Sequence, residues 1–438
     1  MTIVGVKFQA LFGNSPNLRA FAANVSWLVA DKLTRLFVGV LISAWIARYL
    51  GPERFGLLAY ALTLVSLFQA LSMLGLDNLV VRDIAAASER ANVVLGTAVR
   101  LRAAGAAGAY ITLGATVAVL HANDAASAGL ILLAGIAILM QITEVIDLWF
   151  QSQLQSRRTV IAKILSYLTT AAFKVSLVMA GAGLTWFAAA GAMEAALTGL
   201  CLCVSYRLFR TQQRWIWDPI LARQLLKQSW PLLISGLSVF LYMRLSVIVL
   251  REQAGNAEVG LYSVGATLSE MWYFIPMTIF SSVAPIIARK RAEGGDAYER
   301  TLLQIFSGMW AISFAIAALN IVGARTFVNL LYGHQYTKSA EVFAIHALTF
   351  IPVCIGVVQS VWLINEGRSK IALLQAIAGA STALTLNFLL TSSYGAYGAA
   401  IATVVSQFVQ AFLANALLAP DLFRLQCRSL LLTKIFRP

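Results

Sequence analysis

Long apolar segments separated by short polar stretches recur along the whole chain. Each is about as long as a helix needs to cross a membrane, roughly 20 residues. The segments are near-continuous in hydrophobicity, unlike the alternating strands of an outer-membrane barrel. The pattern therefore predicts about twelve membrane-spanning helices in an all-α integral membrane protein, near residues 24–46, 56–76, 95–120, 128–150, 161–182, 184–206, 230–250, 260–286, 302–324, 340–363, 371–391 and 396–419.

Composition supports a membrane protein. Of the 438 residues, 59% are hydrophobic and 12% are charged, and the mean hydropathy is +0.77. A water-soluble domain could not bury that much apolar surface. Residues 1–23 contain Lys7, Asn14, Pro16 and Arg19 and lack a continuous apolar core, so we expect no cleaved signal peptide and a retained first helix.

The chain is strongly basic, with 33 Lys and Arg against 19 Asp and Glu and a formal net charge of +14. In a membrane protein such an excess usually marks the cytoplasmic loops. Most of the basic residues fall in alternate loops of the twelve-span prediction, which supports that count and places both termini in the cytoplasm. We expect no nucleic-acid partner.

The most basic loop, residues 207–229, lies at the midpoint of the chain. Its amphipathic run is expected to lie on the inner leaflet of the membrane; the run consists of Trp215, Trp217, Leu221, Leu225 and Leu226. The loop would separate a six-helix half at 1–206 from a second at 230–420, with a basic cytoplasmic tail at 421–438.

A faint internal repeat relates the two halves. Ser26-Trp27 recurs as Ser229-Trp230, and Gly56-Leu57 with Thr63-Leu64 recurs as Gly260-Leu261 with Thr267-Leu268. Two six-helix repeats share one orientation in the membrane, which predicts pseudo-symmetric halves around a central cavity. This arrangement favours alternating access.

Polar residues inside the predicted spans fall in helical stripes. At about 100° per residue, one face collects Asn24, Asp31 and Arg35, and another collects Lys163, Tyr167, Thr170 and Lys174. Further along the chain, Arg244 and Arg251 are seven residues apart. The acidic and amide positions are Gln141, Glu144, Asp147 and Gln151 along one side of a span, and Glu194 and Glu270 in two others.

These stripes allow two interpretations. Ionised groups in a membrane need compensation, so the stripes can form ion pairs between helices. Alternatively, the cations line a water-filled cavity that receives an anionic head group such as a phosphate or diphosphate. For any one pair both interpretations stay open, while the cations taken as a set favour the cavity.

The sequence has no motif for metal binding, nucleotide binding or catalysis. The four cysteines have no paired spacing, and the three histidines are far apart in the sequence, so no metal site is predicted. The chain has no nucleotide-binding loop, and no nucleophile–base pair or long outer loop that would indicate an enzyme. We expect no cofactor, and energy for transport from an ion gradient, the substrate gradient or a partner.

The first 85 residues resemble a known family. The resemblance rests on Asn24-Val25-Ser26-Trp27, Ala47-Arg48-Tyr49-Leu50-Gly51-Pro52-Glu53, Phe55-Gly56-Leu57, and Leu74-Gly75-Leu76-Asp77 with Val81-Arg82. These stretches resemble the Wzx-type flippases of O-antigen and exopolysaccharide, in the multidrug/oligosaccharidyl-lipid/polysaccharide exporter (MOP) superfamily. The resemblance implies a fold like that of the multidrug MATE exporters.

The resemblance also implies a function. The expected activity is transfer of an undecaprenyl-diphosphate-linked glycan from the cytoplasmic to the periplasmic leaflet of the bacterial inner membrane, by alternating access coupled to an ion gradient. Expected partners are this glycan and membrane lipids, with a polysaccharide polymerase and a chain-length regulator as candidates.

Site candidates follow from the resemblance and from placement in the spans. Candidate substrate-binding residues are Arg35, Arg48, Lys174, Arg244, Arg251, Asn24 and Tyr167. Candidates for ion coupling or gating are Asp31, Asp77, Arg82, Glu144, Asp147, Glu194 and Glu270. Among the substrate-binding candidates, Arg48 lies inside the matching motif and is also compatible with a structural role. Asp77 and Arg82 are expected to form a gate or to fix a loop as a pair.

Two alternatives from other classes remain. A multidrug exporter of the same superfamily would bind cations in an acidic and aromatic cavity, which the cationic stripes oppose. A membrane polysaccharide polymerase or ligase would need a long periplasmic loop, whereas the longest outer loop predicted here is near 324–340.

Overall fold

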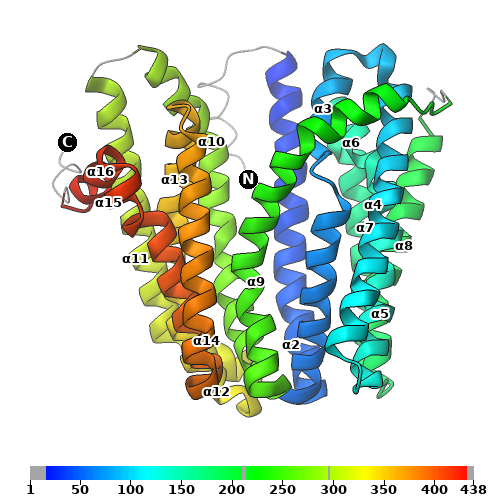
Figure 1. Cartoon of the computed structure of the whole chain (residues 1–438), viewed down its shortest axis with the longest axis vertical. Helices are drawn as coiled ribbons and strands as arrows, with labels where there is room; N and C mark the ends of the chain where they lie inside the picture. The colour runs from blue at the N-terminus through cyan, green and yellow to red at the C-terminus, as the bar shows by residue number, and fades with distance from the viewer. Residues whose placement is uncertain (1–15, 210–213, 294–295, 432–438) are drawn as a thin grey trace. The chain divides into compact units, whose positions relative to one another are not determined.

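The computed structural model describes residues 16–209, 214–293 and 296–431, and within these ranges every regular element is helical (Figure 1). Eight helical segments of this part are long and apolar enough to cross a membrane. The predicted all-α membrane fold is therefore confirmed. The ends of the chain, at 1–15 and 432–438, and residues 210–213 of the predicted linker lie outside the described residues.

The predicted spans correspond to identifiable helices. In chain order these are α2 (Pro16–Ser72), α4 (Ala91–Leu120), α5 (Ala125–Met140) with η2 (Gln141–Glu144) and α6 (Val145–Ser152), α7 (Ser156–Met179), α8 (Leu184–Arg207), α9 (Pro219–Glu270) with η3 (Met271–Tyr273) and α10 (Phe274–Glu293), α11 (Asp296–Leu331), α12 (Thr337–His346) with η5 (Ala347–Thr349) and α13 (Phe350–Asn365), and α14 (Ser369–Phe408) with η6 (Val409–Leu413) and α15 (Asn415–Leu418).

Four shorter elements lie outside the predicted spans. They are α3 (Asp77–Ala86), η1 (Ser88–Arg90), η4 (His334–Tyr336) and α16 (Pro420–Leu431). The helix α3 carries Asp77, Arg82 and Asp83, and these charges hide it from a search for apolar runs. It packs against α4 and α6 through Leu79 and Val80.

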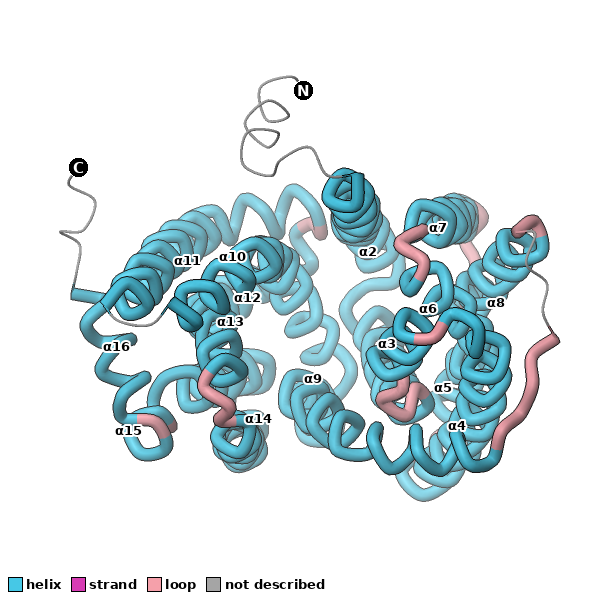
Figure 2. Tube along the Cα trace, turned by 90° about the horizontal axis from the view of Figure 1, so that it is seen from above, coloured by secondary structure: helices cyan, strands magenta, loops and turns pink. Residues whose placement is uncertain are grey.

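Packing divides the chain into two units. The first comprises residues up to 42 and 68–234, and the second comprises 43–67 and 235 onward. In the first unit, α8 packs against both α5 and α7, and Figure 2 shows α4, α5, α7 and α8 nearly end-on. In the second unit, α10, α11 and α13 pack against one another, and α16 packs against α11. The segment 43–67, which the sequence assigns to the first half, is thus described with the second unit.

The linker after α8 is docked on the first unit. The Trp215 indole donates a hydrogen bond to the Tyr206 hydroxyl at 3.0 Å, and the Ile216 amide donates to the Asn92 carbonyl at 3.2 Å. Leu225 at the start of α9 is buried in the apolar core of this unit. Trp215 is thus partly buried and Leu225 buried by partners within the protein, while the position of the linker on the inner leaflet stays a prediction.

Local sequence explains where α9 begins. The Asp218 carboxylate accepts hydrogen bonds from the amides of Ile220 and Leu221, at 2.8 and 3.1 Å. Asp is a favoured N-cap, and Pro219 occupies the first helical position, where its missing N–H costs nothing. The chain is thereby turned from the docked linker into the long helix.

Each half contains a long helix that bends sharply at a glycine, forming a helical hairpin. The helix α2 bends at Gly51, where φ is 72°, and α9 bends at Gly255, where φ is 86°. Glycine adopts this left-handed region without steric cost. The two bends are as far apart in the sequence as Gly56 and Gly260 of the predicted repeat, so the structure adds a second matching feature to that repeat.

Within the second unit the two hairpins cross closely. A Cβ atom at Gly56 would overlap the carbonyl oxygen of Asn256, and one at Gly260 would overlap the carbonyl oxygen of Pro52. The contact is reciprocal, as in a two-fold arrangement, and the Asn256 amide also donates to the Glu53 carboxylate at 3.2 Å. The crossing requires a residue without a side chain at both positions.

Gly56→Ala and Gly260→Ala are each expected to lower the thermal unfolding midpoint of the purified protein, because the added methyl group meets backbone that cannot rotate away. Overpacking typically costs about 1–3 kcal/mol. Gly191→Ala is the matched control, since a Cβ at Gly191 meets no atom within 4 Å. Melting of the Gly56 and Gly260 variants at the temperature of the control would contradict the close crossing.

Candidate functional site

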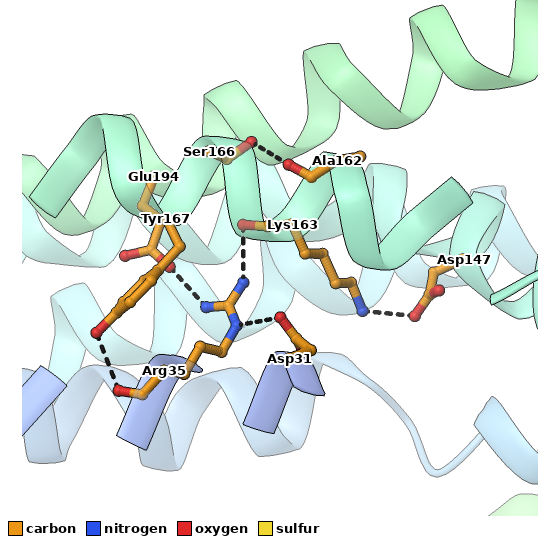
Figure 3. A network of polar contacts seen from close by, with 8 residues as sticks. All are labelled: Asp31, Arg35, Asp147, Ala162, Lys163, Ser166, Tyr167 and Glu194. Atoms are coloured by element: carbon orange, nitrogen blue, oxygen red, sulfur yellow. Dashed lines mark hydrogen bonds and ion pairs between the residues drawn. The ribbon is translucent and has the colours of Figure 1, made fainter. Parts of the chain in front are cut away.

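An ion-pair network in the first unit centres on Arg35 of α2 (Figure 3). Its guanidinium donates to Asp31 at 3.1 Å, to Glu194 of α8 at 2.9 Å and to the carbonyl oxygen of Lys163 at 3.2 Å. It also lies over the Tyr167 ring, 4.8 Å from the centroid, while the Tyr167 hydroxyl donates to the Arg35 carbonyl at 3.1 Å. The stripes on α2 and α7 therefore meet each other, with α8 supplying the second carboxylate.

Two lysines of α7 complete the network. The Lys163 ammonium lies 2.5 Å from the Asp147 carboxylate of α6, which also accepts from Gln151 at 2.9 Å. The Lys174 ammonium lies 4.0 Å from Glu194, which is thus shared with Arg35. Three cations are matched by three carboxylates, so each cation of this network already has an acidic neighbour.

This balance changes the sequence-based interpretation. The surplus of cations expected in the spans is not found in this network. The Arg35 and Glu194 side chains keep 31% and 22% of their surface exposed, so the pair is reachable rather than sealed. An incoming anion would bind Arg35 by replacing a carboxylate.

The second unit holds a comparable pair on α9. Two nitrogens of the Arg244 guanidinium donate to the two oxygens of Glu270, at 3.3 and 3.1 Å. This two-pronged geometry is the strong form of the Arg–carboxylate bond. The side chains are 35% and 21% exposed, which is close to the exposure of the Arg35–Glu194 pair.

A buried polar cluster adjoins this pair, since its member Ser269 precedes Glu270 in the chain. The His346 ring nitrogens are within hydrogen-bond distance of the hydroxyls of Ser269 and Tyr262, and the Tyr262 hydroxyl is 3.0 Å from that of Thr403. Thr403 also contacts the Ser246 hydroxyl at 2.9 Å. Sequence reasoning considered His346 for metal binding alone and missed this cluster, although a histidine inside a predicted span was a usable signal.

Arg48 and Arg251 have other surroundings. The Arg48 guanidinium donates to the carbonyl oxygens of Asn329 and Leu330 at the C-terminal end of α11, where a cation complements the helix dipole. Arg251 lies over the Tyr60 ring, 5.8 Å from the centroid. Both contacts are within the second unit, and a substrate role for either residue stays a prediction.

Asp77 and Arg82 form ion pairs with other residues and not with each other, and their role as a gate or in fixing the loop stays a prediction. Asp77 pairs with Arg102 of α4, whose side chain is only 5% exposed. Arg82 pairs with Asp83 and donates to Gln228 at 2.9 Å. Asp77 and Arg82 cannot pair with each other on α3, because residues five apart in a helix do not share a face. The position of Arg102 inside a predicted span was a usable signal, because a charge there needs an acidic partner.

Glu144 and Asn24 are the two other candidate residues of the first unit. Glu144 ends the 3₁₀ turn η2 between α5 and α6 and lies outside the Arg35 network. Asn24 lies in α2, but its side chain is outside the described residues.

Comparisons with known proteins agree with this architecture. A family model described as "Polysaccharide biosynthesis protein" matches residues 21–291. A Shigella dysenteriae protein that carries the provisional name of O-antigen transporter is 26% identical over 185 residues, which is 42% of this chain and 46% of that protein. The match thus spans about half the length of that curated relative.

Solved transporter structures share the fold. An inward-facing MATE multidrug transporter of the MOP superfamily has a TM-score of 0.68 at 14% identity, covering 90% of this chain and 96% of its own. The lipid II flippase MurJ in an inward closed conformation gives 0.65 at 12% identity, covering 94% and 91%. A MOP transporter from Pyrococcus furiosus gives 0.63 at 15%, covering 94% and 99%. The MATE-like fold expected from the first 85 residues is confirmed, and the chain is a multi-pass membrane protein.

Removing one member of the Arg35–Glu194 pair is expected to destabilise the protein by about 1–3 kcal/mol, because a charge is left unpaired inside the membrane; the partial exposure keeps the cost below that of a sealed pair. Arg35→Gln and Glu194→Gln should each lower the thermal unfolding midpoint, and the double variant should recover part of the loss. Additive losses in the double variant would show that the two groups do not interact.

Proposed function

Because the chain belongs to the polysaccharide biosynthesis protein family, whose model matches more than half of it, we propose that it is a flippase for a lipid-linked oligosaccharide. This is the family that the motifs within residues 24–84 indicate. The fold shared with MOP transporters supports a transport protein rather than an enzyme. The names of the O-antigen transporter and of the lipid II flippase both point to lipid-linked glycans.

In its full form the proposal names a substrate and a direction. The substrate is an undecaprenyl-diphosphate-linked repeat unit of O-antigen or exopolysaccharide. It moves from the cytoplasmic to the periplasmic leaflet of the bacterial inner membrane by alternating access, driven by an ion gradient. Both termini lie in the cytoplasm, and a polysaccharide polymerase and a chain-length regulator are the candidate partners downstream.

The observation that carries this proposal is the pair of reachable guanidinium groups held by carboxylates of the same chain. A diphosphate offers pairs of oxygens that the planar guanidinium can bind through two parallel hydrogen bonds. Binding would proceed by exchange, in which the diphosphate displaces Glu194 from Arg35 or Glu270 from Arg244. On release the carboxylate returns to its arginine, so the empty site is never left with an uncompensated charge.

Lys174 and Tyr167 would assist at the first of these arginines. Lys174 lies 4.0 Å from Glu194 and would hold that carboxylate after Arg35 has released it. Tyr167 fixes the guanidinium from its ring face and bonds the Arg35 backbone. Asp31 stays beside Arg35, and Asp147 stays with Lys163.

Cells that lack this protein are expected to accumulate undecaprenyl-diphosphate-linked repeat units on the cytoplasmic side of the membrane, because the head group cannot cross without a carrier. The measurement is the fraction of units that a periplasmic glycan-modifying enzyme can reach. Supplying the wild-type chain from a plasmid should restore access.

Two other results would contradict the proposal. Unpolymerised units that reach the periplasm normally would indicate a polymerase or ligase. An unchanged glycan pool together with increased sensitivity to cationic drugs would indicate a multidrug exporter.

A charge-neutral double variant separates substrate binding from structural pairing. Arg244→Gln combined with Glu270→Gln removes both charges, so little unfolding is expected. Loss of transport with normal membrane levels is the expected result, because the diphosphate has lost its guanidinium. The single change Arg244→Lys tests geometry, since lysine keeps the charge but not the fork. Wild-type transport by the double variant would overturn a role for Arg244 in binding.

A further inference from the structure

A small polar cavity lies in the first unit, and none of the residues that line it belongs to the Arg35 network. It opens between the end of α2, the middle of α4 and the junction of α5 with η2, and its volume of about 10 Å³ is room for about one water molecule. Its polar lining comes from Ser72, Arg102, Gln141 and Glu144. The helix tightens into the 3₁₀ turn η2 at this cavity, and such a turn within a helical span often marks a functional position.

The charges around the cavity do not balance when Glu144 is ionised. Four charged groups act electrostatically on the Glu144 carboxyl: Arg102 of α4, Asp77 of α3, Asp147 of α6 and Lys163 of α7. Of these, Arg102 also lines the cavity. The four groups already form two complete pairs, Arg102 with Asp77 and Lys163 with Asp147. Glu144 is therefore a third carboxylate beside two cations. Across the ranges that the structure describes, no hydrogen bond or ion pair involves its carboxylate.

Two unused hydrogen-bonding atoms line the same cavity. Within the described chain, the buried Nε–H of Arg102 has no acceptor and the buried Oε1 of Gln141 has no donor. Leaving such atoms unsatisfied is costly. An ionised Glu144 can accept a hydrogen bond from Arg102, whereas a protonated Glu144 can donate one to Gln141. The cavity thus offers a partner for each protonation state of one carboxyl group.

We propose that Glu144 is the proton-carrying group that couples transport to the proton gradient, with Arg102 and Gln141 as its alternate partners. The inference rests on the proposed flippase function. Protonation from the periplasmic water converts the carboxylate to a carboxylic acid and removes the surplus negative charge, and release of the same proton to the cytoplasm restores it. The cavity has room for little more than one water molecule, which suits a proton rather than a hydrated sodium ion.

The proposed switch would reach α2 directly. Ser72, the last residue of α2, shares the cavity with Glu144. The next turn contains Leu74 at φ 54° and Gly75 at φ 65°, and a Cβ at Gly75 would lie 2.9–3.3 Å from the backbone of Ser229 and Leu233 in α9. A change of partner at Glu144 therefore acts beside the place where α2, α3 and α9 pack within the first unit.

The test uses the full-length protein in liposomes that contain a fluorescent undecaprenyl-diphosphate-linked glycan and a pH-sensitive dye. The measured quantity is the ratio of flipping rates with and without a pH gradient, together with proton movement. For the wild type the ratio should exceed one and protons should move. For Glu144→Gln the ratio should fall to one and proton movement should stop, because glutamine mimics the protonated state permanently.

Two further variants make the test specific. Glu89→Gln removes an exposed carboxylate of the same unit and should keep the wild-type ratio. Gln141→Met removes the acceptor for protonated Glu144 and should shift the pH midpoint of flipping to lower pH. This second variant retains both pairs around the cavity, so it reports on protonation even if Glu144→Gln folds poorly.

The outcomes separate this inference from the flippase proposal. Wild-type flipping without any response to pH would overturn the proton role of Glu144 and leave flipping intact, as would a Glu144→Gln variant that keeps its response. Acceleration by a sodium gradient instead, lost in Glu144→Gln, would replace the proton with sodium. Absence of wild-type flipping would overturn the function and the inference together.

Discussion

The cost of an unpaired charge inside a membrane governs this structure. An ionised side chain surrounded by hydrocarbon must find a partner on another helix, so each charged stripe dictates which helices lie together. Arg35 brings α2 to α8 through Glu194, and Lys163 joins α7 to α6 through Asp147. In the second unit Arg244 and Glu270 join two positions of α9. In the proposed function, Arg35 and Arg244 are also the groups that bind the anionic substrate.

Compensation within the chain also suits a transporter. A site with free cations would hold a diphosphate tightly and release it slowly, whereas a site whose arginines exchange carboxylate for phosphate binds less strongly and resets itself. Guanidinium groups that are about one-third exposed meet both needs, because they are accessible yet remain paired when no substrate is present. Glu144 differs from Glu194 and Glu270, because among the residues that the structure describes no ion pair involves its carboxylate.

Much of the fold follows from the sequence, because hydrophobic runs of span length leave few alternatives to helices. The bend at Gly51 followed by Pro52 was also readable, since this pair ends one helix and begins another. The helix α3 and the docking of Trp215 on Tyr206 were not readable. The first is too polar to register as a span, and the second depends on a contact that no local pattern encodes.

The site was predicted less completely. Helical phase correctly grouped Asp31 with Arg35, but phase says which residues share a face and not which helix that face meets. The partner of Asp77 was therefore missed, because it lies on a different helix. The carboxylates of Glu194 and Glu270 were recognised as candidates, while their role as holders of specific arginines needed the structure.

The most direct test of the central claim is leaflet exchange by the purified protein. Liposomes would carry a fluorescent undecaprenyl-diphosphate-linked glycan in both leaflets, and a membrane-impermeant quencher would report the fraction in the outer one over time. The account predicts that vesicles with the protein expose nearly all of the probe, while protein-free vesicles expose about half. Equal exposure in both would contradict it.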